Sequence, residues 1–221
     1  MNMLNHAPDR VRALASYDQL ASSYDASCNH LVDARFMAAH LLHLRDGDTV
    51  FDVACGTGPM LPILSGLVSP SGYVVGIEQS PPMGAVAFER GSLCRNVDVL
   101  VNPVEEFGTE RRADALLFCY TQDVLQSPAA LANLFAHTKP GARIAVLGGR
   151  FLSWWLAPVN LFTAYRARHY TTTFRGFRRP WEPLLVYCPD LQVVRGYHAG
   201  TSYLATGIYR PPRGGLPVSR A

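Results

Sequence analysis

The sequence predicts an α/β fold built on a doubly wound, Rossmann-like sheet whose strands are mostly parallel. Two observations support this prediction. Short apolar runs of strand length alternate with helical segments between residues 49 and 147, and this alternation is typical of parallel sheets covered on both faces. A late stretch, 191–210, holds two strand patterns joined by His198-Ala199-Gly200-Thr201, which predicts an antiparallel hairpin at the end of the sheet.

The elements can be justified in chain order. Apolar residues recur at helical spacing from Arg10 to Leu44, and a turn is expected at 45–48. The elements expected after this turn are a strand over Thr49–Ala54, a helix over Met60–Val68, a strand over Tyr73–Ile77, a helix over Pro82–Arg90, strands over Val97–Val101 and Ala113–Cys119, a helix over Pro128–Thr138 and a strand over Arg143–Leu147. Lys139-Pro140-Gly141 is expected to end the last of these helices.

Length and composition indicate a single domain. The chain has 221 residues, of which 48% are hydrophobic, so it can bury a sizeable core. We divide it into an N-terminal helical lid (10–45), a core (46–149), a substrate-cap insertion (150–183), a C-terminal hairpin (184–210) and a mobile tail (211–221).

Several classes of protein are disfavoured by composition. No uninterrupted apolar run is long enough to span a membrane, and the first residues lack a signal-peptide pattern, so we expect a cytoplasmic protein. The five cysteines are scattered without zinc-ligand spacing, which predicts reduced thiols and no metal site. A net charge of +3 is too mild to indicate nucleic acid.

A glycine-bearing loop follows the first predicted strand, in Asp52-Val53-Ala54-Cys55-Gly56-Thr57-Gly58. It lacks the GxxxxGK[ST] phosphate loop, and Leu61 occupies the place of the third glycine of a dinucleotide fingerprint. Gly56 and Gly58 still let a ligand approach the backbone closely, and Asp52 offers a negative charge to an ammonium group. Cys55 is interpreted as a small buried residue and not as a nucleophile.

A second acid, Glu78, ends the second predicted strand 26 residues after Asp52. An acid at this position can accept hydrogen bonds from a ribose diol. A glycine loop, a carboxylate for an amine and a diol-binding acid, without a phosphate grip, together describe a nucleoside joined to an amino acid. This combination points to S-adenosylmethionine (SAM) as cofactor, with S-adenosylhomocysteine (SAH) as product.

The same motifs resemble those of class I (Rossmann-like) SAM-dependent methyltransferases, in the branch of ubiquinone/menaquinone-type and small-molecule methyltransferases. VFDVACGTG resembles the first motif of this family, and GYVVGIEQSPPM resembles the second. ADALLFCYTQDVLQSP and HTKPGARIAVLGG resemble the fourth- and fifth-strand motifs. The resemblance covers about residues 14–150 and the final hairpin, and it implies a seven-stranded sheet whose last strand is antiparallel.

The resemblance also implies roles for individual residues. The methionine part of SAM would contact Asp52, Gly56 and Gly58, and Ala54 is a further cofactor position. Glu78 would bind the ribose, Gln79 and Met83 would flank the adenine, and Tyr17 and Tyr24 would close over the cofactor. Further cofactor positions are Asn102, Pro103, Val104, Cys119 and Tyr120. The chain departs from the family at Pro103, where an acid is frequent, and at Gln122, where histidine is frequent.

The segment 150–181 is rich in aromatic residues and holds six arginines without an acid. It follows the fifth strand, so we expect it to cover the ligand face of the sheet. Its aromatic side chains suit a flat or apolar substrate. The arginines either bind an anionic group or lie over the surface of a packed helical cap.

We therefore expect a methyltransferase acting on oxygen or nitrogen of a small, partly aromatic or apolar acceptor. If a base is used, the candidates are His198, Tyr170 and His169. Two alternatives stay open: methylation of phospholipid headgroups at a membrane surface, and a SAM-binding protein that does not methylate. Peripheral membrane contact and a monomer or homodimer are compatible with the sequence, and nucleic acid is not an expected partner.

Overall fold

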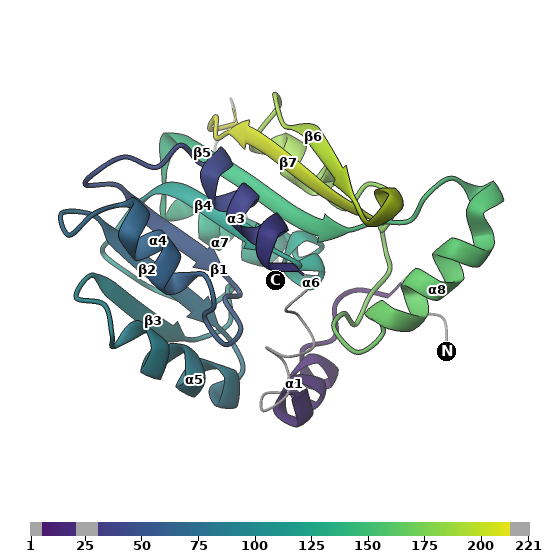
Figure 1. The fold of residues 1–221 in the computed structure, drawn as a ribbon, viewed down its shortest axis with the longest axis horizontal. Coiled ribbons are helices and arrows are strands. Elements are labelled where there is room, and N and C mark those ends of the chain that lie inside the picture. Colours follow the sequence, from purple (N-terminus) through teal and green to yellow (C-terminus); the bar gives the residue numbers. More distant parts are fainter. Residues whose placement is uncertain (1–5, 21–30, 213–221) are drawn as a thin grey trace.

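The computed structural model describes residues 6–20 and 31–212, and a seven-stranded sheet lies at its centre (Figure 1). Its strands are β1 (Thr49–Val53), β2 (Tyr73–Glu78), β3 (Val97–Val101), β4 (Ala113–Cys119), β5 (Thr138–Gly149), β6 (Gln192–Tyr197) and β7 (Ser202–Ile208). The helices are α1 (Arg10–Leu20), α3 (Val32–Leu41), α4 (Leu61–Leu67), α5 (Pro81–Gly91), α6 (Gln122–Leu125), α7 (Pro128–Ala136) and α8 (Ala157–Ala167), with short 3₁₀ turns η2 (Trp154–Leu156), η3 (Glu182–Val186) and η4 (His198–Gly200).

The strand order is β3-β2-β1-β4-β5-β7-β6. Strands β1 to β5 pair in parallel, whereas β7 is antiparallel to both β5 and β6. The chain runs outward from β1 to β3 and then crosses back to β4 on the other side of β1, which makes the sheet doubly wound. The predicted fold class is therefore confirmed, including the antiparallel last strand. The β1–β4 boundary is the topological switch point, where such sheets bind ligands.

Helices cover both faces because successive side chains of a strand point to opposite sides. Val50 of β1 belongs to a buried cluster with residues of α3, α4 and α5. Phe51 and Val53 belong to a second cluster with α7 and the η3 region. Asp52 lies two residues after Val50 in β1, so its side chain points to the same face of the sheet, the one that α3 covers.

Two helices begin with the same Ser-Pro signal. The Ser80 hydroxyl accepts a hydrogen bond from the Met83 amide at the start of α5, and the Ser127 hydroxyl accepts one from the Ala130 amide at the start of α7. Proline follows each serine at the first helical position, where a missing amide costs nothing. These caps fix where α5 leaves the end of β2, close to Glu78.

The prediction for 137–142 was wrong in detail. Helix α7 ends at Ala136, and Lys139-Pro140-Gly141 lies inside β5. The Thr138 hydroxyl donates to the Leu134 carbonyl and so satisfies the end of the helix. The proline and glycine are tolerated in the strand because the β4–β5 register is irregular there.

Helix α8 extends away from the sheet on the same side of the molecule as α1 (Figure 1), and none of its residues is buried. In the described part of the chain, no helix combines the length and apolarity needed to cross a bilayer. The expected tail at 211–221 lies almost wholly outside the described residues, as does Tyr24.

Candidate active site

Two residues with unusual backbone geometry mark the switch point. Ala54 follows β1 with φ of 52°, and Tyr120 follows β4 with φ of 59°. Left-handed backbone is uncommon outside glycine and is costly unless the surroundings hold it. Here the Tyr120 amide donates to the Leu147 carbonyl at 2.7 Å, and the Cys55 amide donates to the Ile77 carbonyl at 3.0 Å. The two central strands therefore turn away sharply at the same edge, which opens room between them.

Glu78 holds the first loop in place. Its carboxylate accepts hydrogen bonds from the Gly56 and Ser80 amides, both at 2.8 Å. The side chain is buried, and this burial raises its pKa, while the hydrogen bonds from the amides oppose the rise. Glu78 thus joins the loop after β1 to the start of α5, a structural role that its position in the sequence does not reveal.

Asp52 is the buried acid behind the loop. Only 2% of its surface is exposed, and its Oδ2 has no hydrogen-bond partner among the described residues. Burial raises the pKa of Asp52 to about 7; the Arg35 guanidinium opposes the rise and the Glu78 carboxylate adds to it. A buried carboxylate oxygen without a partner is costly, and an ammonium group is the kind of ligand that would relieve this cost.

The thiols beside this loop are not activated. Burial raises the pKa of both Cys55 and Cys119, and the charge of Asp52 raises it further. Both thiols are therefore protonated at neutral pH, which agrees with the structural interpretation of Cys55.

A small cavity of about 50 Å³ lies over the loop. Its lining includes the predicted cofactor residues Tyr17, Ala54, Gly56, Glu78, Gln79, Met83, Cys119 and Tyr120, together with Thr121, Gln122, Asp123, Val124 and Tyr170. Pockets that enclose small ligands usually exceed about 300 Å³. The Tyr17 hydroxyl donates to the Tyr170 carbonyl at 2.7 Å, so this contact must open before a nucleoside-sized molecule can enter.

Five predicted cofactor residues in the described part of the chain do not line this cavity, namely Asp52, Gly58, Asn102, Pro103 and Val104. Asn102, Pro103 and Val104 follow β3; Asn102 is exposed, and Val104 is part of the core. Gly58 has φ of 71°, and a Cβ there would lie 2.6 Å from Leu61 Cδ1. Gly58 therefore permits close packing of the loop on α4, and its predicted contact with methionine stays a prediction.

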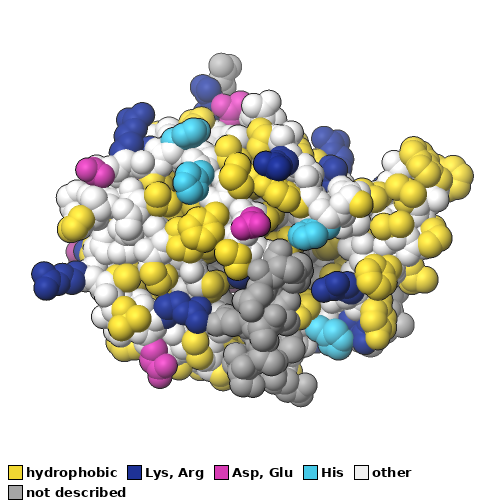
Figure 2. All heavy atoms as spheres, viewed as in Figure 1, with side chains coloured by type: hydrophobic (Ala, Val, Ile, Leu, Met, Phe, Trp, Pro, Cys, Tyr) yellow, Lys and Arg dark blue, Asp and Glu magenta, His cyan; other side chains and the backbone are white. Residues whose placement is uncertain are grey.

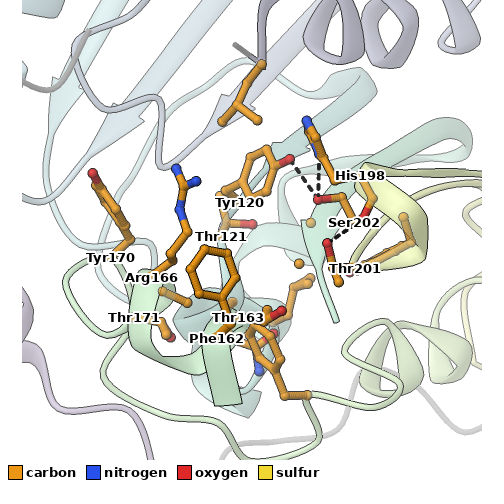
Figure 3. Close-up of a pocket in the computed structure, with 18 of the residues that line it drawn as sticks. Tyr120, Thr121, Phe162, Thr163, Arg166, Tyr170, Thr171, His198, Thr201 and Ser202 are labelled. Carbon is orange, nitrogen blue, oxygen red and sulfur yellow. Dashed lines mark hydrogen bonds between the residues drawn. The ribbon is translucent and has the colours of Figure 1, made fainter. Parts of the chain in front are cut away.

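A larger cavity of about 390 Å³ adjoins the first (Figure 3). It is enclosed by the ends of β4 and β5, by α8 and by the β6–β7 turn, and five residues line both cavities: Tyr17, Tyr120, Thr121, Gln122 and Tyr170. At its floor, Gly148 leaves space for the Tyr203 ring, since a Cβ on Gly148 would lie 2.9 Å from Tyr203 Cε1. Its walls are predominantly apolar, with Arg166 and His198 at the edge.

Polar groups meet on one wall of the larger cavity. The Tyr120 hydroxyl donates to Ser202 Oγ at 3.3 Å, and His198 Nδ1 lies 3.3 Å from the same oxygen (Figure 3). His198, Ala199 and Gly200 all have left-handed backbone, which turns His198 toward the cavity. Of the three candidate bases, His198 and Tyr170 line the cavity. His169 is exposed and lines neither cavity.

A polar clamp that the sequence did not suggest holds the cap over the site. The Asp123 carboxylate accepts hydrogen bonds from the Thr171 hydroxyl and from both the amide and the hydroxyl of Thr172, at 2.7–3.1 Å. The Gln122 amide group donates to the Arg175 carbonyl at 2.9 Å. Gln122 therefore anchors the cap and is not positioned as a base. The run of three threonines at 171–173 was the sequence feature from which this clamp could have been inferred.

Comparison with known proteins agrees with this geometry. Residues 50–141 match the methyltransferase domain family. The chain is 28% identical to demethylmenaquinone methyltransferase of Symbiobacterium thermophilum, over 59% of this chain and 56% of that protein. It is 29% identical to 2-phytyl-1,4-naphthoquinone methyltransferase of Synechococcus elongatus, over 64% of each. The chain thus spans less than two thirds of the length of these curated relatives.

Among solved structures, the N-methyltransferase NodS of Bradyrhizobium japonicum in complex with SAH matches 90% of this chain and 98% of its own, with a TM-score of 0.65 and 14% identity. This likeness concerns the fold. In fold, loop and sequence the chain is similar to class I, Rossmann-like SAM-dependent methyltransferases, with the methyltransferase domain at residues 50–141. Within this class, its sequence similarity is to the branch that includes the quinone methyltransferases.

Proposed function

We propose that the chain transfers a methyl group from SAM to a small, flat and largely apolar acceptor of the quinone type. The observation that carries this proposal is the pair of adjoining cavities with five shared lining residues. One cavity is lined by the loop residues Ala54 and Gly56 and by Glu78; the other is predominantly apolar and is bordered by the cap. Such an arrangement suits a cofactor and an acceptor that must meet in line while water is excluded.

The residues at the first loop fit the cofactor. Asp52 would hold the ammonium group, the backbone at Ala54 and Gly56 would hold the methionine part, and Glu78 would accept the ribose hydroxyls. Gln79 and Met83 line the same cavity at the start of α5 and would flank the adenine. When bound, SAM supplies an electrophilic methyl group on a sulfonium. The protein then contributes alignment and shielding.

The acceptor would lie in the larger cavity. Phe162 and Tyr170 from the cap face Tyr120 and His198 across this space (Figure 3). His198 is our candidate base: it would take the proton from an acceptor hydroxyl or amine, while Ser202 holds Nδ1. The names of the relatives extend the acceptor class to naphthoquinone-type rings, and the acceptor atom stays a prediction.

Two other functions are less well supported. Methylation of a phospholipid headgroup needs room for a charged amine, whereas the larger cavity is mostly apolar. A SAM-binding protein without methyl transfer is less well supported, because the cavity over the loop adjoins a second cavity of about 390 Å³ that could hold an acceptor. A small-molecule acceptor, a cytoplasmic location and a monomer or homodimer complete the proposal.

A direct test combines binding and turnover. Calorimetry with SAH should show binding to the full chain. Incubation with methyl-labelled SAM and separate acceptors, namely a reduced naphthoquinone, a phenol, an arylamine and phosphatidylethanolamine, should then give a product heavier by one methylene with the ring acceptors. Absence of SAH binding would overturn the proposal. Turnover restricted to phosphatidylethanolamine would replace it with the phospholipid alternative.

A further inference from the structure

The outer face of the cap carries a group of exposed apolar side chains. Trp154, Trp155, Leu161 and Tyr165, which we call the cap apolar face, are 74%, 66%, 73% and 62% exposed. They lie on η2 and α8, the part that projects from the body, where Figure 2 shows apolar side chains gathered. Single exposed apolar residues are ordinary, but a contiguous group with two tryptophans marks a surface for binding.

The cap is rich in arginine. Arg166 lies on α8, and Arg168, just after its end, stacks over the Tyr165 ring of the cap apolar face. Arg175, Arg178 and Arg179 follow in the same insertion, where Arg179 pairs with Glu182, and the sequence has no acid between Asp123 and Glu182. Asp123 itself is turned inward to the two threonines. Tryptophan beside arginine is the composition that lies in the interface of anionic membranes.

The same helix also borders the larger cavity. Val159, Phe162 and Arg166 line that cavity, and Val159 and Phe162 are also 36% and 61% exposed. Apolar surface therefore runs from the outside of α8 to the wall of the cavity. An apolar acceptor dissolved in a bilayer could pass along this surface without crossing water.

We propose that the cap apolar face docks onto the surface of an anionic lipid bilayer, so that the larger cavity opens toward the lipid. The docking itself is independent of catalysis, whereas the delivery of an acceptor rests on the function proposed above. Tryptophan and leucine side chains would enter the headgroup boundary, and the arginines would contact lipid phosphates.

Flotation with vesicles tests the docking. The full chain should float with vesicles of phosphatidylcholine and phosphatidylglycerol at 3:1, and more weakly with phosphatidylcholine alone or at high salt. The triple variant W154S/W155S/L161S, which spares the cavity lining, should bind at least about tenfold more weakly, since each residue contributes buried apolar area. A matched control, L93S/V186S, removes apolar residues that are 84% and 54% exposed elsewhere and should float like the parent.

Two further measurements distinguish membrane docking from dimerisation and from a failure of the proposed function. Light scattering reports whether a second copy covers the face: a dimer that the triple variant converts to a monomer would overturn membrane docking, as would undiminished flotation of the variant. Methyl transfer to a water-soluble, short-chain ring acceptor should be equal in the parent and the variant. Flotation without any methyl transfer would contradict the proposed function and leave the docking intact.

Discussion

Asp52 is a buried acid of the candidate site whose charge changes near neutral pH. The side chain is almost fully buried, its Oδ2 lacks a partner among the described residues, and its pKa is raised to about 7. A ligand ammonium group placed against it would favour the charged carboxylate. We therefore expect cofactor binding and proton release to be coupled at this residue.

Replacing Asp52 should remove that coupling. Near pH 7 about half of the Asp52 side chains carry a proton in the free protein, so SAH binding should release roughly half a proton. Calorimetry in two buffers of different ionisation enthalpy measures this number. The Asp52→Asn variant should release none and should bind SAH about 10- to 100-fold more weakly, the loss expected for one hydrogen bond to a charged group.

The Asp46→Asn variant is the matched control, because Asp46 is an exposed acid in the turn before the same strand. It should bind SAH like the parent. Equal proton release by the parent and by Asp52→Asn would show that another group couples to the cofactor.

The role of a single residue can be predicted from the sequence only where its contacts follow from the local pattern. Asp52 and Glu78 could be selected from sequence, because each ends a predicted strand beside a glycine loop or a Ser-Pro start. Gly58 was assigned to the ligand because loop glycines serve both ligands and packing, and the sequence does not show that Leu61 lies 2.6 Å from its missing Cβ. His169 and His198 looked equivalent until the turn at 198–200 was placed.

At the scale of elements, two glycines at helix α4 give opposite expectations for stability: Gly58 precedes the helix, and Gly66 lies within it. Gly58 has φ of 71° and no room for a Cβ, while Gly66 in α4 has nothing within 4 Å of that position. Gly58→Ala should lower the free energy of unfolding by more than about 1 kcal/mol. Gly66→Ala should raise it by about 0.5–1 kcal/mol, because alanine restricts the unfolded chain and favours helix.

Urea denaturation of the two variants measures both changes on one scale. The pair is its own control, since each substitution adds one methyl group next to or within the same helix. Destabilisation of equal size in both variants would contradict the packing described for Gly58.

The Asp123 clamp gives a prediction about the cap. Asp123→Ala removes the acceptor for three donors of Thr171 and Thr172. The Thr171 hydroxyl keeps the Thr173 carbonyl as an acceptor, whereas the amide and the hydroxyl of Thr172 lose theirs, and a buried donor left without a partner costs about 1–3 kcal/mol. Amide hydrogen exchange across 168–178 should become faster, while exchange in β1 and β4 should not change. For a methyl acceptor, KM should rise more than kcat falls.

The Gln126→Ala variant serves as comparison, because its amide group makes a single, longer contact of 3.3 Å with the Pro180 carbonyl. It should affect exchange less. Unchanged exchange at 168–178 in Asp123→Ala would show that other contacts hold the cap.

Elements differ in how far the sequence predicts them. Strands β3 and β4 agree with their predicted bounds. β4 is a buried parallel strand and forms a continuous apolar run, whereas β3 lies at the edge of the sheet and was predicted from its valine-rich run. The interior of 150–183 could not be predicted: α8 buries no residue, so it has no apolar stripe facing a core. The position of this insertion depends on hydrogen bonds between its residues 170–175 and Tyr17, Gln122 and Asp123, which are distant in sequence.

The whole molecule joins a sheet with a fixed ligand edge to a cap and an N-terminal helix that cross over it. The Asp9 amide donates to the Thr172 hydroxyl, the Thr173 hydroxyl donates to the His6 carbonyl, and Tyr17 contacts Tyr170. The N-terminal segment and the cap are therefore linked by hydrogen bonds, and we expect access to both cavities to depend on these contacts.

The global stability of the ligand-free protein should fall as the pH rises from about 4 to about 7. Asp52 binds its proton more tightly in the folded chain, where its pKa is about 7, than in the unfolded chain, where it is near its ordinary value. Its favourable contribution is therefore complete below the unfolded pKa and is lost as the pH passes through the folded one. Glu78, whose pKa is also raised by burial, adds in the same direction.

Urea denaturation at several pH values, with the parent and Asp52→Asn side by side, measures this contribution as a difference. The stability of the variant relative to the parent should increase with pH across this window, with a slope of at most about 1.4 kcal/mol per pH unit for one site. Saturating SAH should restore the parent above pH 7, because an ammonium group compensates the charged carboxylate, and should do so less in the variant. Parallel pH profiles for the two proteins would show that Asp52 titrates alike in the folded and unfolded chains, and that its burial does not control the charge of the site.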